Sequence, residues 1–104
     1  MKIPKVPKIT HQQAAILSML RLGSLSGKEI RARLIALAIK TSLPNFYQSM
    51  ARLERAKYVK GFYDQTTFVG ARTRRVRERR YTLQPKGMSA VRGLFEFYHF
   101  VRSQ

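Results

Sequence analysis

Among the side chains of this sequence whose type and spacing suggest a chemical role, arginines are the most prominent. Four of them recur within one short stretch of the second half: Arg72, Arg74, Arg75 and Arg77. A guanidinium group is a planar fork that donates two parallel hydrogen bonds, which matches the geometry of phosphate oxygens. The cluster therefore predicts contact with a polyanion, and the alternative is a charged surface that is only solvated.

A second set of polar side chains recurs at helical spacing in the middle of the chain: Asn45, Gln48, Ser49 and Arg52. Glutamine and arginine can form paired hydrogen bonds with the edges of adenine and guanine. Tyr47 lies within the same stretch. Because any amphipathic helix also exposes a polar stripe, a solvent-facing surface is the alternative interpretation.

The charge of the whole chain favours an anionic partner. Its 104 residues include 21 Lys and Arg against 5 Asp and Glu, a formal net charge of +16 at pH 7. Between Arg52 and Arg80, ten basic residues stand against three acidic ones. Hydrophobic residues make up 44%, enough for one domain with an ordinary core, so a disordered chain is excluded.

Several chemistries lack the residues they need. The sequence has no cysteine, which excludes disulfides, cysteine-ligated zinc and a thiol nucleophile. His11 and His99 are isolated and the carboxylates are scattered, so we predict no enzyme, no metal and no cofactor. The longest apolar run, Leu34 to Ile39, is too short to cross a membrane, and Met1 to Lys8 lacks the apolar stretch of a signal peptide. We expect a cytoplasmic, nucleoid-associated protein without membrane contact.

Three helices are predicted in the first half of the chain. A capping box from Thr10 to Gln13 opens the first, which ends at Gly23. A second box at Ser26 opens a helix to about Lys40, with a core stripe of Ile30, Leu34 and Leu37. The third helix runs from a Ser42 cap and Pro44 to about Lys57, with Phe46, Met50 and Leu53 facing the core.

The second half changes to the period of a β-hairpin. Tyr58 to Tyr63 and Arg79 to Leu83 are predicted strands, separated by a long tip that carries the four arginines. A final helix runs from Pro85 to about Arg102, and Phe46, Phe62, Tyr81 and Phe95 are expected in the core. The fold class is mainly α with a two-stranded β-hairpin, in the order α-α-α-β-β-α of a winged helix-turn-helix. We divide the chain into a basic flexible arm (1–9), a winged-helix domain (10–84) and a C-terminal dimerisation helix (85–104).

The last helix is apolar around most of its circumference, and such a helix must be buried on more than one side. We therefore predict a homodimer through this helix, with a single deeply buried helix as the alternative. The expected interface residues are Leu94, Phe95, Phe97, Tyr98 and Val101.

The chain resembles the PadR-type winged-helix transcriptional regulators over residues 14–92. The resemblance is carried by Ile16 to Leu20, Gly23 to Ile30, Ser42 to Tyr47, Met50 to Glu54 and Arg79 to Gly87. The last four are similar to the family's G-x-L-x-G-x-E-I, S-P-G-T-L-Y, L-x-x-L-E and R-x-Y-x-L-T-P-x-G motifs. The family usually has Tyr at the position of Lys28 and a Gly-Leu pair before Val59, and its wing is shorter and has fewer arginines.

The resemblance implies a sequence-specific, homodimeric regulator of transcription, a repressor, that binds double-stranded DNA. It also implies that Tyr47 and its neighbours approach the phosphate backbone. By the same resemblance, Phe97, Tyr98 and Phe100 can line a pocket for a small aromatic effector at the dimer interface. Two alternatives stay open on the sequence: an RNA-binding or ribosome-associated winged-helix protein, and a protein-interaction module that docks through its last helix.

Overall fold

The computed structural model describes residues 9–64 and 78–103. Four α-helices carry the fold: α1 (His11–Met19), α2 (Gly27–Ala36), α3 (Leu43–Arg55) and α4 (Pro85–Arg102). A 3₁₀ turn, η1 (Leu20–Leu22), extends α1, and three strands form the sheet: β1 (Leu25–Ser26), β2 (Val59–Asp64) and β3 (Glu78–Leu83). The predicted order of helices and hairpin strands is confirmed, with β1 as an addition.

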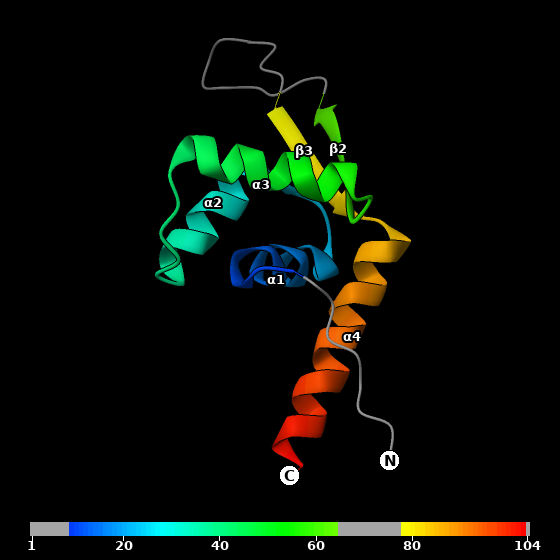
Figure 1. Ribbon diagram of the computed structural model, residues 1–104. Helices are drawn as coiled ribbons and strands as arrows, with labels where there is room; N and C mark the ends of the chain where they lie inside the picture. The colour runs from blue at the N-terminus through cyan, green and yellow to red at the C-terminus, as the bar shows by residue number, and fades with distance from the viewer. Residues whose placement is uncertain (1–8, 65–77, 104) are drawn as a thin grey trace.

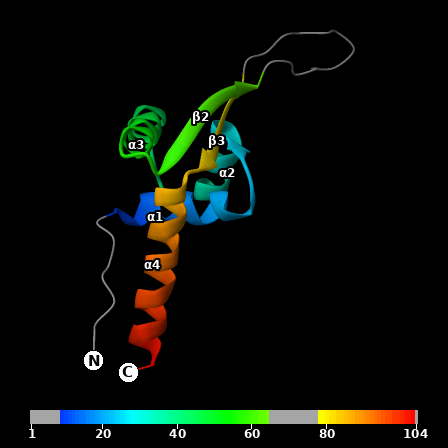
Figure 2. The same ribbon diagram turned by 90° about the vertical axis from the view of Figure 1, so that its right-hand side faces the viewer.

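The helices surround a small core, and the hairpin stands beside α3 (Figure 1). Helix α4 leaves the end of β3 and passes α1 (Figures 1 and 2). In both views its C-terminal half lies clear of the other helices and strands that the structure describes. The fold is thus a helix-turn-helix of α2 and α3 with a hairpin on one side and a projecting terminal helix.

The sheet is antiparallel in the order β1-β3-β2. The hairpin register runs from Val59 opposite Leu83 to Asp64 opposite Glu78. Strand β1 adds Leu25 opposite Tyr81 on the other edge of β3. Two residues are too few to show a period of two, so β1 arises from pairing with β3 and has no sequence signal of its own.

The core is formed by one face of each helix and by the central strand, β3. Its members include Ile16 and Leu17 of α1, Ile30 and Leu34 of α2, Phe46, Met50 and Leu53 of α3, Val59, Tyr81 and Val91. Three of the residues expected in the core lie outside it: Leu37, Phe62 and Phe95 are 60%, 37% and 49% exposed. Leu37 follows the end of α2, while Phe62 and Phe95 lie on faces of β2 and α4 that no described element covers completely.

Side-chain caps open the first three helices as predicted. At α1, the Thr10 hydroxyl accepts a hydrogen bond from the Gln13 amide and the Gln13 side chain accepts one from the Thr10 amide. Ser26 and Ser42 likewise accept bonds from the backbone amides of Glu29 and Asn45. These bonds satisfy amides that have no partner inside a helix, and they define where α1, α2 and α3 begin.

Two helices end earlier than predicted because a residue turns into the left-handed region. Helix α2 ends at Ala36 and not near Lys40, since Ala38 has φ 59°. Helix α3 ends at Arg55, since Lys57 has φ 65°. In each case the next amide bonds back to the last turn, Ile39 to Leu34 and Tyr58 to Leu53, both at 2.9 Å. This closure usually contains glycine.

We expect Ala38→Gly to stabilise the protein by about 0.5–1 kcal/mol. Glycine removes a left-handed strain of about 1–2 kcal/mol and adds a smaller entropy loss on folding. Ala32→Gly, at an exposed position in the middle of α2, should instead destabilise by about 1 kcal/mol. Urea unfolding of both variants measures the difference, and a shift of the two midpoints in the same direction would contradict this account of the turn.

Candidate nucleic-acid interface

The outermost face of α3 is polar and stands opposite the core. Gln48, Ala51, Arg52 and Arg55 follow one another at helical spacing, and all four are exposed. The core-facing residues of the same helix, Phe46, Met50 and Leu53, are at most 1% exposed. Gln48 and Arg52 can therefore contact a partner without any change in the core. Ala51 and Arg55 share this face and were not among the predicted site residues.

The other predicted residues of α3 lie on its two flanks. Asn45 and Ser49 lie toward α1, and together with Gln48, Arg52, Ile39 and the first turn of α1 they line a hollow of about 440 Å³. Tyr47 lies on the opposite flank beside α2, 49% exposed, with its ring edge-on to Phe46 at 5.2 Å between centroids. The structure thus brings all five predicted residues of α3 onto one continuous surface.

A bidentate ion pair joins α3 to the base of the hairpin. One guanidinium nitrogen of Arg79 donates to both carboxylate oxygens of Glu54 at 2.8 Å. The hydrogen bond to Glu54 raises the pKa of Arg79 above its ordinary value. The Arg79 guanidinium also lies over the rings of Tyr63 and Tyr81, with centroids at 5.0 and 5.6 Å. Burial raises the pKa of the Tyr81 phenol above its ordinary value.

Gly61 makes room for this ion pair. A Cβ atom at this position of β2 would overlap the side chains of both Arg79 and Glu54. The ion pair between Arg79 and Glu54 therefore crosses β2 at Gly61, the position of this strand that carries no side chain. Its effect is to hold α3 and the hairpin in one orientation.

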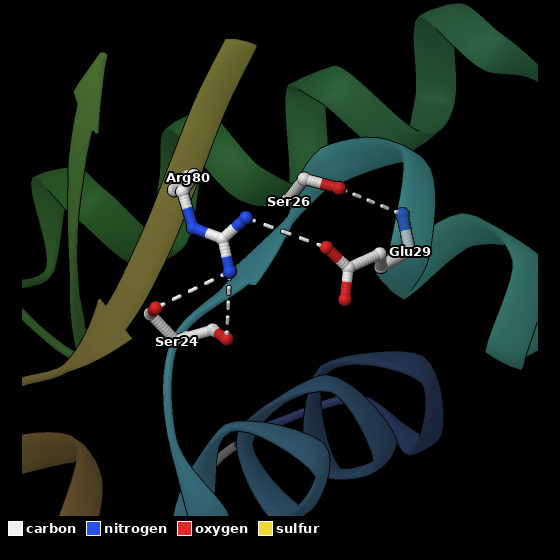
Figure 3. Close-up of polar contacts among 4 residues, drawn as sticks. All are labelled: Ser24, Ser26, Glu29 and Arg80. Atoms are coloured by element: carbon white, nitrogen blue, oxygen red, sulfur yellow. Dashed lines mark hydrogen bonds and ion pairs between the residues drawn. The ribbon is translucent and has the colours of Figure 1, made fainter. Parts of the chain in front are cut away.

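A second contact joins β3 to the start of α2 (Figure 3). Arg80 donates to the carbonyl oxygen of Ser24 at 3.2 Å and to the Glu29 carboxylate at 3.4 Å. The Glu29 carboxylate therefore accepts a hydrogen bond from Arg80. The sequence had predicted this carboxylate as half of a capping box at Ser26. Of the basic residues counted in this region, Arg79 and Arg80 are occupied by contacts inside the domain.

Two predicted basic segments lie outside the described residues. They are the tip of the hairpin with Arg72, Arg74, Arg75 and Arg77, and the arm from Met1 to Lys8. Ile9, which we had assigned to the arm, is half-buried and packs against the core. The roles of both segments stay predictions.

The exposed residues of α4 form a stripe along its projecting half. Phe95, Tyr98 and Val101 are 49%, 58% and 50% exposed. Leu94, also predicted at a dimer interface, is 8% exposed and is already buried within the single chain. Phe97 is half-buried, with its ring edge-on to that of Tyr98 at 5.5 Å. An interface between copies would therefore involve mainly the stripe from Phe95 to Val101.

Within the described residues, no cluster of three or more His, Asp or Glu side chains could hold a metal ion. His11 begins α1, and His99 lies near the C-terminal end of α4. None of the described helices is long and apolar enough to cross a membrane.

A helix-turn-helix followed by a hairpin that is bonded to its second helix defines the winged helix-turn-helix class. Among solved structures, the chain is similar to a PadR family transcription regulator from Clostridium difficile, with a TM-score of 0.74 and 17% identity over 90% of this chain and 93% of that one. A transcriptional regulator from Clostridium thermocellum gives a TM-score of 0.65 and 24% identity over 88% and 85% of the two chains.

A third similar structure is that of Bacillus subtilis PadR in complex with operator DNA. The TM-score is 0.68 and the identity 19%, over 88% of this chain and 49% of that one. The sequence matches no protein-family model and no curated protein. The likeness establishes that the chain has the winged-helix fold of the PadR-type regulators, which confirms the predicted fold class.

Proposed function

We propose that this protein is a sequence-specific regulator of transcription that binds double-stranded DNA as a homodimer. Helix α3 enters the major groove, whose width of about 12 Å admits an α-helix. Gln48 and Arg52 contact base edges, and the arginine-rich tip of the wing follows the phosphate backbone. The observation that carries the proposal is the polar face of α3, which is fully exposed and opposite the core.

The charge and the similar structures support the same proposal. A net charge of +16 favours a polyanion over an uncharged partner. Several of the similar structures are described as transcription regulators, and one of them is bound to operator DNA. These descriptions agree with the prediction that the chain is not an enzyme. We also propose a role as a repressor, which the resemblance to the family implies, and a location in the cytoplasm with the nucleoid, where the proposed DNA partner lies.

The stripe on α4 supports the homodimer. Phe95, Tyr98 and Val101 are exposed on the C-terminal half of α4, where only the Phe95 ring has a described neighbour, the Arg21 guanidinium at 5.0 Å. The end of this helix lies clear of the other described elements (Figure 2). Water contact with such exposed apolar side chains is unfavourable, and a second copy of the helix offers the same apolar stripe. A two-fold dimer would place two α3 helices about one DNA turn apart.

We expect random duplex DNA to yield a two-fold symmetric binding sequence in a selection experiment. Gln48→Ala and Arg52→Ala should each relax the preference at one or two symmetric positions by about 1–3 kcal/mol, because a paired hydrogen bond to one base is lost. Arg92→Ala, which removes an exposed arginine from α4, is the matched control and should keep the preference. Sedimentation velocity should give a dimer.

Other results would contradict this proposal. If Gln48→Ala and Arg52→Ala both keep the parent's order of preferred sequences, α3 does not read bases. Tighter binding to structured RNA than to any duplex would favour the RNA-binding alternative.

A further inference from the structure

Among the four residues of the outermost face of α3, Ala51 alone is apolar. It is exposed and follows Gln48 by three residues, so these two side chains are neighbours on the helix surface. The other members of the face, Gln48, Arg52 and Arg55, are long and polar. Because alanine has the shortest side chain of the four, the surface is both lowest and apolar at Ala51.

Two larger neighbours of Ala51 are held away from it. Tyr47 precedes Ala51 by one helical turn, but its ring lies toward α2, where a Cβ atom at Gly27 would be 3.8 Å from it. Glu54 follows Ala51 by three residues, and its carboxylate is bonded to Arg79 of the hairpin at 2.8 Å. The methyl group of Ala51 is therefore left uncovered by the neighbours that could shield it.

An uncovered methyl group on a groove-binding helix has a direct counterpart in duplex DNA. Thymine carries a C5-methyl group that points into the major groove, whereas the other three bases are distinguished there by hydrogen-bond donors and acceptors. Contact between two methyl groups removes apolar surface from water on both partners, which is favourable. The short side chain of Ala51 also allows the helix to approach the base edges closely.

The position of Ala51 relative to Gln48 indicates which base pair it reaches. Three residues of an α-helix rise about 4.5 Å, and successive positions along one DNA strand are about 3.4 Å apart. The two spacings are similar. A helix whose Gln48 contacts one base pair therefore brings Ala51 to a neighbouring base pair.

We propose that Ala51 is a specificity-determining residue that selects thymine at a base pair next to the one that Gln48 contacts. Its methyl group contacts the C5-methyl group of this thymine in the major groove. The inference rests on the proposed function. It adds an apolar contact, and a particular base, to the hydrogen bonds proposed for Gln48 and Arg52.

The test uses the selected duplex with deoxyuridine in place of thymine, at one symmetric pair of positions at a time. Uracil keeps the base pair and lacks only the C5-methyl group. We expect one such pair of positions, next to those that depend on Gln48, at which uracil weakens binding of the full chain on the order of tenfold, because one methyl contact is lost in each half-site. Uracil at the other thymine positions should have little effect.

Ala51→Gly removes the methyl group from the protein. This variant should bind the thymine and uracil duplexes with nearly equal affinity, because the partner of the C5-methyl group is gone. Ala32→Gly is the matched control, since it removes the same group from an exposed alanine of α2 and lowers helix propensity equally. It should keep the parent's discrimination between thymine and uracil.

Circular dichroism establishes that each variant is folded. If Ala51→Gly does not fold, Ala51→Ser takes its place, because serine keeps a small side chain and has a higher helix propensity than glycine. Its hydroxyl group replaces the apolar contact by a polar one, so the discrimination between thymine and uracil should decrease.

The outcomes separate this inference from the proposed function. If the parent binds its selected duplex equally well with uracil at every thymine position, Ala51 contributes only to the stability of α3, and the inference is wrong while the proposed function stands. If folded Ala51→Gly keeps the parent's preference for thymine over uracil, another side chain contacts that methyl group, and the inference is again wrong. If the parent binds no duplex DNA, the proposed function itself fails.

Discussion

The affinity of this protein for duplex DNA should fall by about 10³- to 10⁵-fold between 50 and 200 mM salt. This range applies to a protein that makes about 6–10 phosphate contacts, each of which releases counterions from the duplex. With 21 Lys and Arg per chain, a dimer has more than enough cations for that number. Fluorescence anisotropy across the salt series gives the slope directly.

The tip of the wing should account for part of this slope. Simultaneous replacement of Arg72, Arg74, Arg75 and Arg77 by alanine should reduce the slope and weaken binding to all sequences almost equally, because phosphate contacts carry little sequence information. The melting temperature should stay at the parent's value. If the affinity of the parent protein for duplex DNA does not depend on salt, the positive charge of the chain does not contact phosphates. If the four-fold alanine variant has a much lower melting temperature than the parent, these arginines stabilise the fold.

Gly87→Val should destabilise the fold by about 3 kcal/mol, the upper end of what overpacking usually costs. A Cβ atom at Gly87 would overlap the carbonyl oxygen of Tyr58 and lie 2.7 Å from a methyl group of Leu83. That carbonyl cannot easily move, because it accepts the amide hydrogen bond of Gln84 at 3.0 Å and directly precedes β2. For a domain of this size the melting temperature should drop by at least about 10 °C.

Ser89→Ala is the control for this substitution. Ser89 is exposed in the same part of α4, and its replacement should change stability by less than about 0.5 kcal/mol. Thermal unfolding followed by circular dichroism compares the two variants. If the Gly87→Val variant has the same melting temperature as the parent, α4 does not approach Tyr58 closely in solution. The same contact explains why a glycine stands two residues after Pro85 in this chain.

The features that the sequence predicted best are those that depend on residues close together along the chain. The caps at Thr10, Ser26 and Ser42 form because the hydroxyl that accepts the bond is three residues from the amide that donates it. The faces of α3 were also predictable, since the polar and apolar residues alternate with the period of the helix. Leu37 was misplaced because the same period was continued past Ala36, the last residue of α2.

The contacts between distant segments had no local signal. Arg79 and Glu54 are 25 residues apart, and Arg80 and Ser24 are 56 apart. From the sequence, the charges of Arg79 and Arg80 indicated only a basic surface. In the fold, β3 places these two arginines beside carboxylate and carbonyl oxygens. Phe62 and Phe95 were misplaced for a related reason, since aromatic residues were assigned to the core by type alone.

The bond between Glu54 and Arg79 has a consequence for recognition. Because it holds the hairpin against α3, the distance between α3 and the base of the hairpin is set before any partner binds. In the proposed complex the protein is therefore preorganised, and little conformational entropy is lost there on association. Any mismatch in curvature or groove width must be removed by deforming the DNA. Flexible pyrimidine–purine steps would then be favoured at positions that no side chain touches, so this one ion pair makes the stiffness of the DNA part of its specificity.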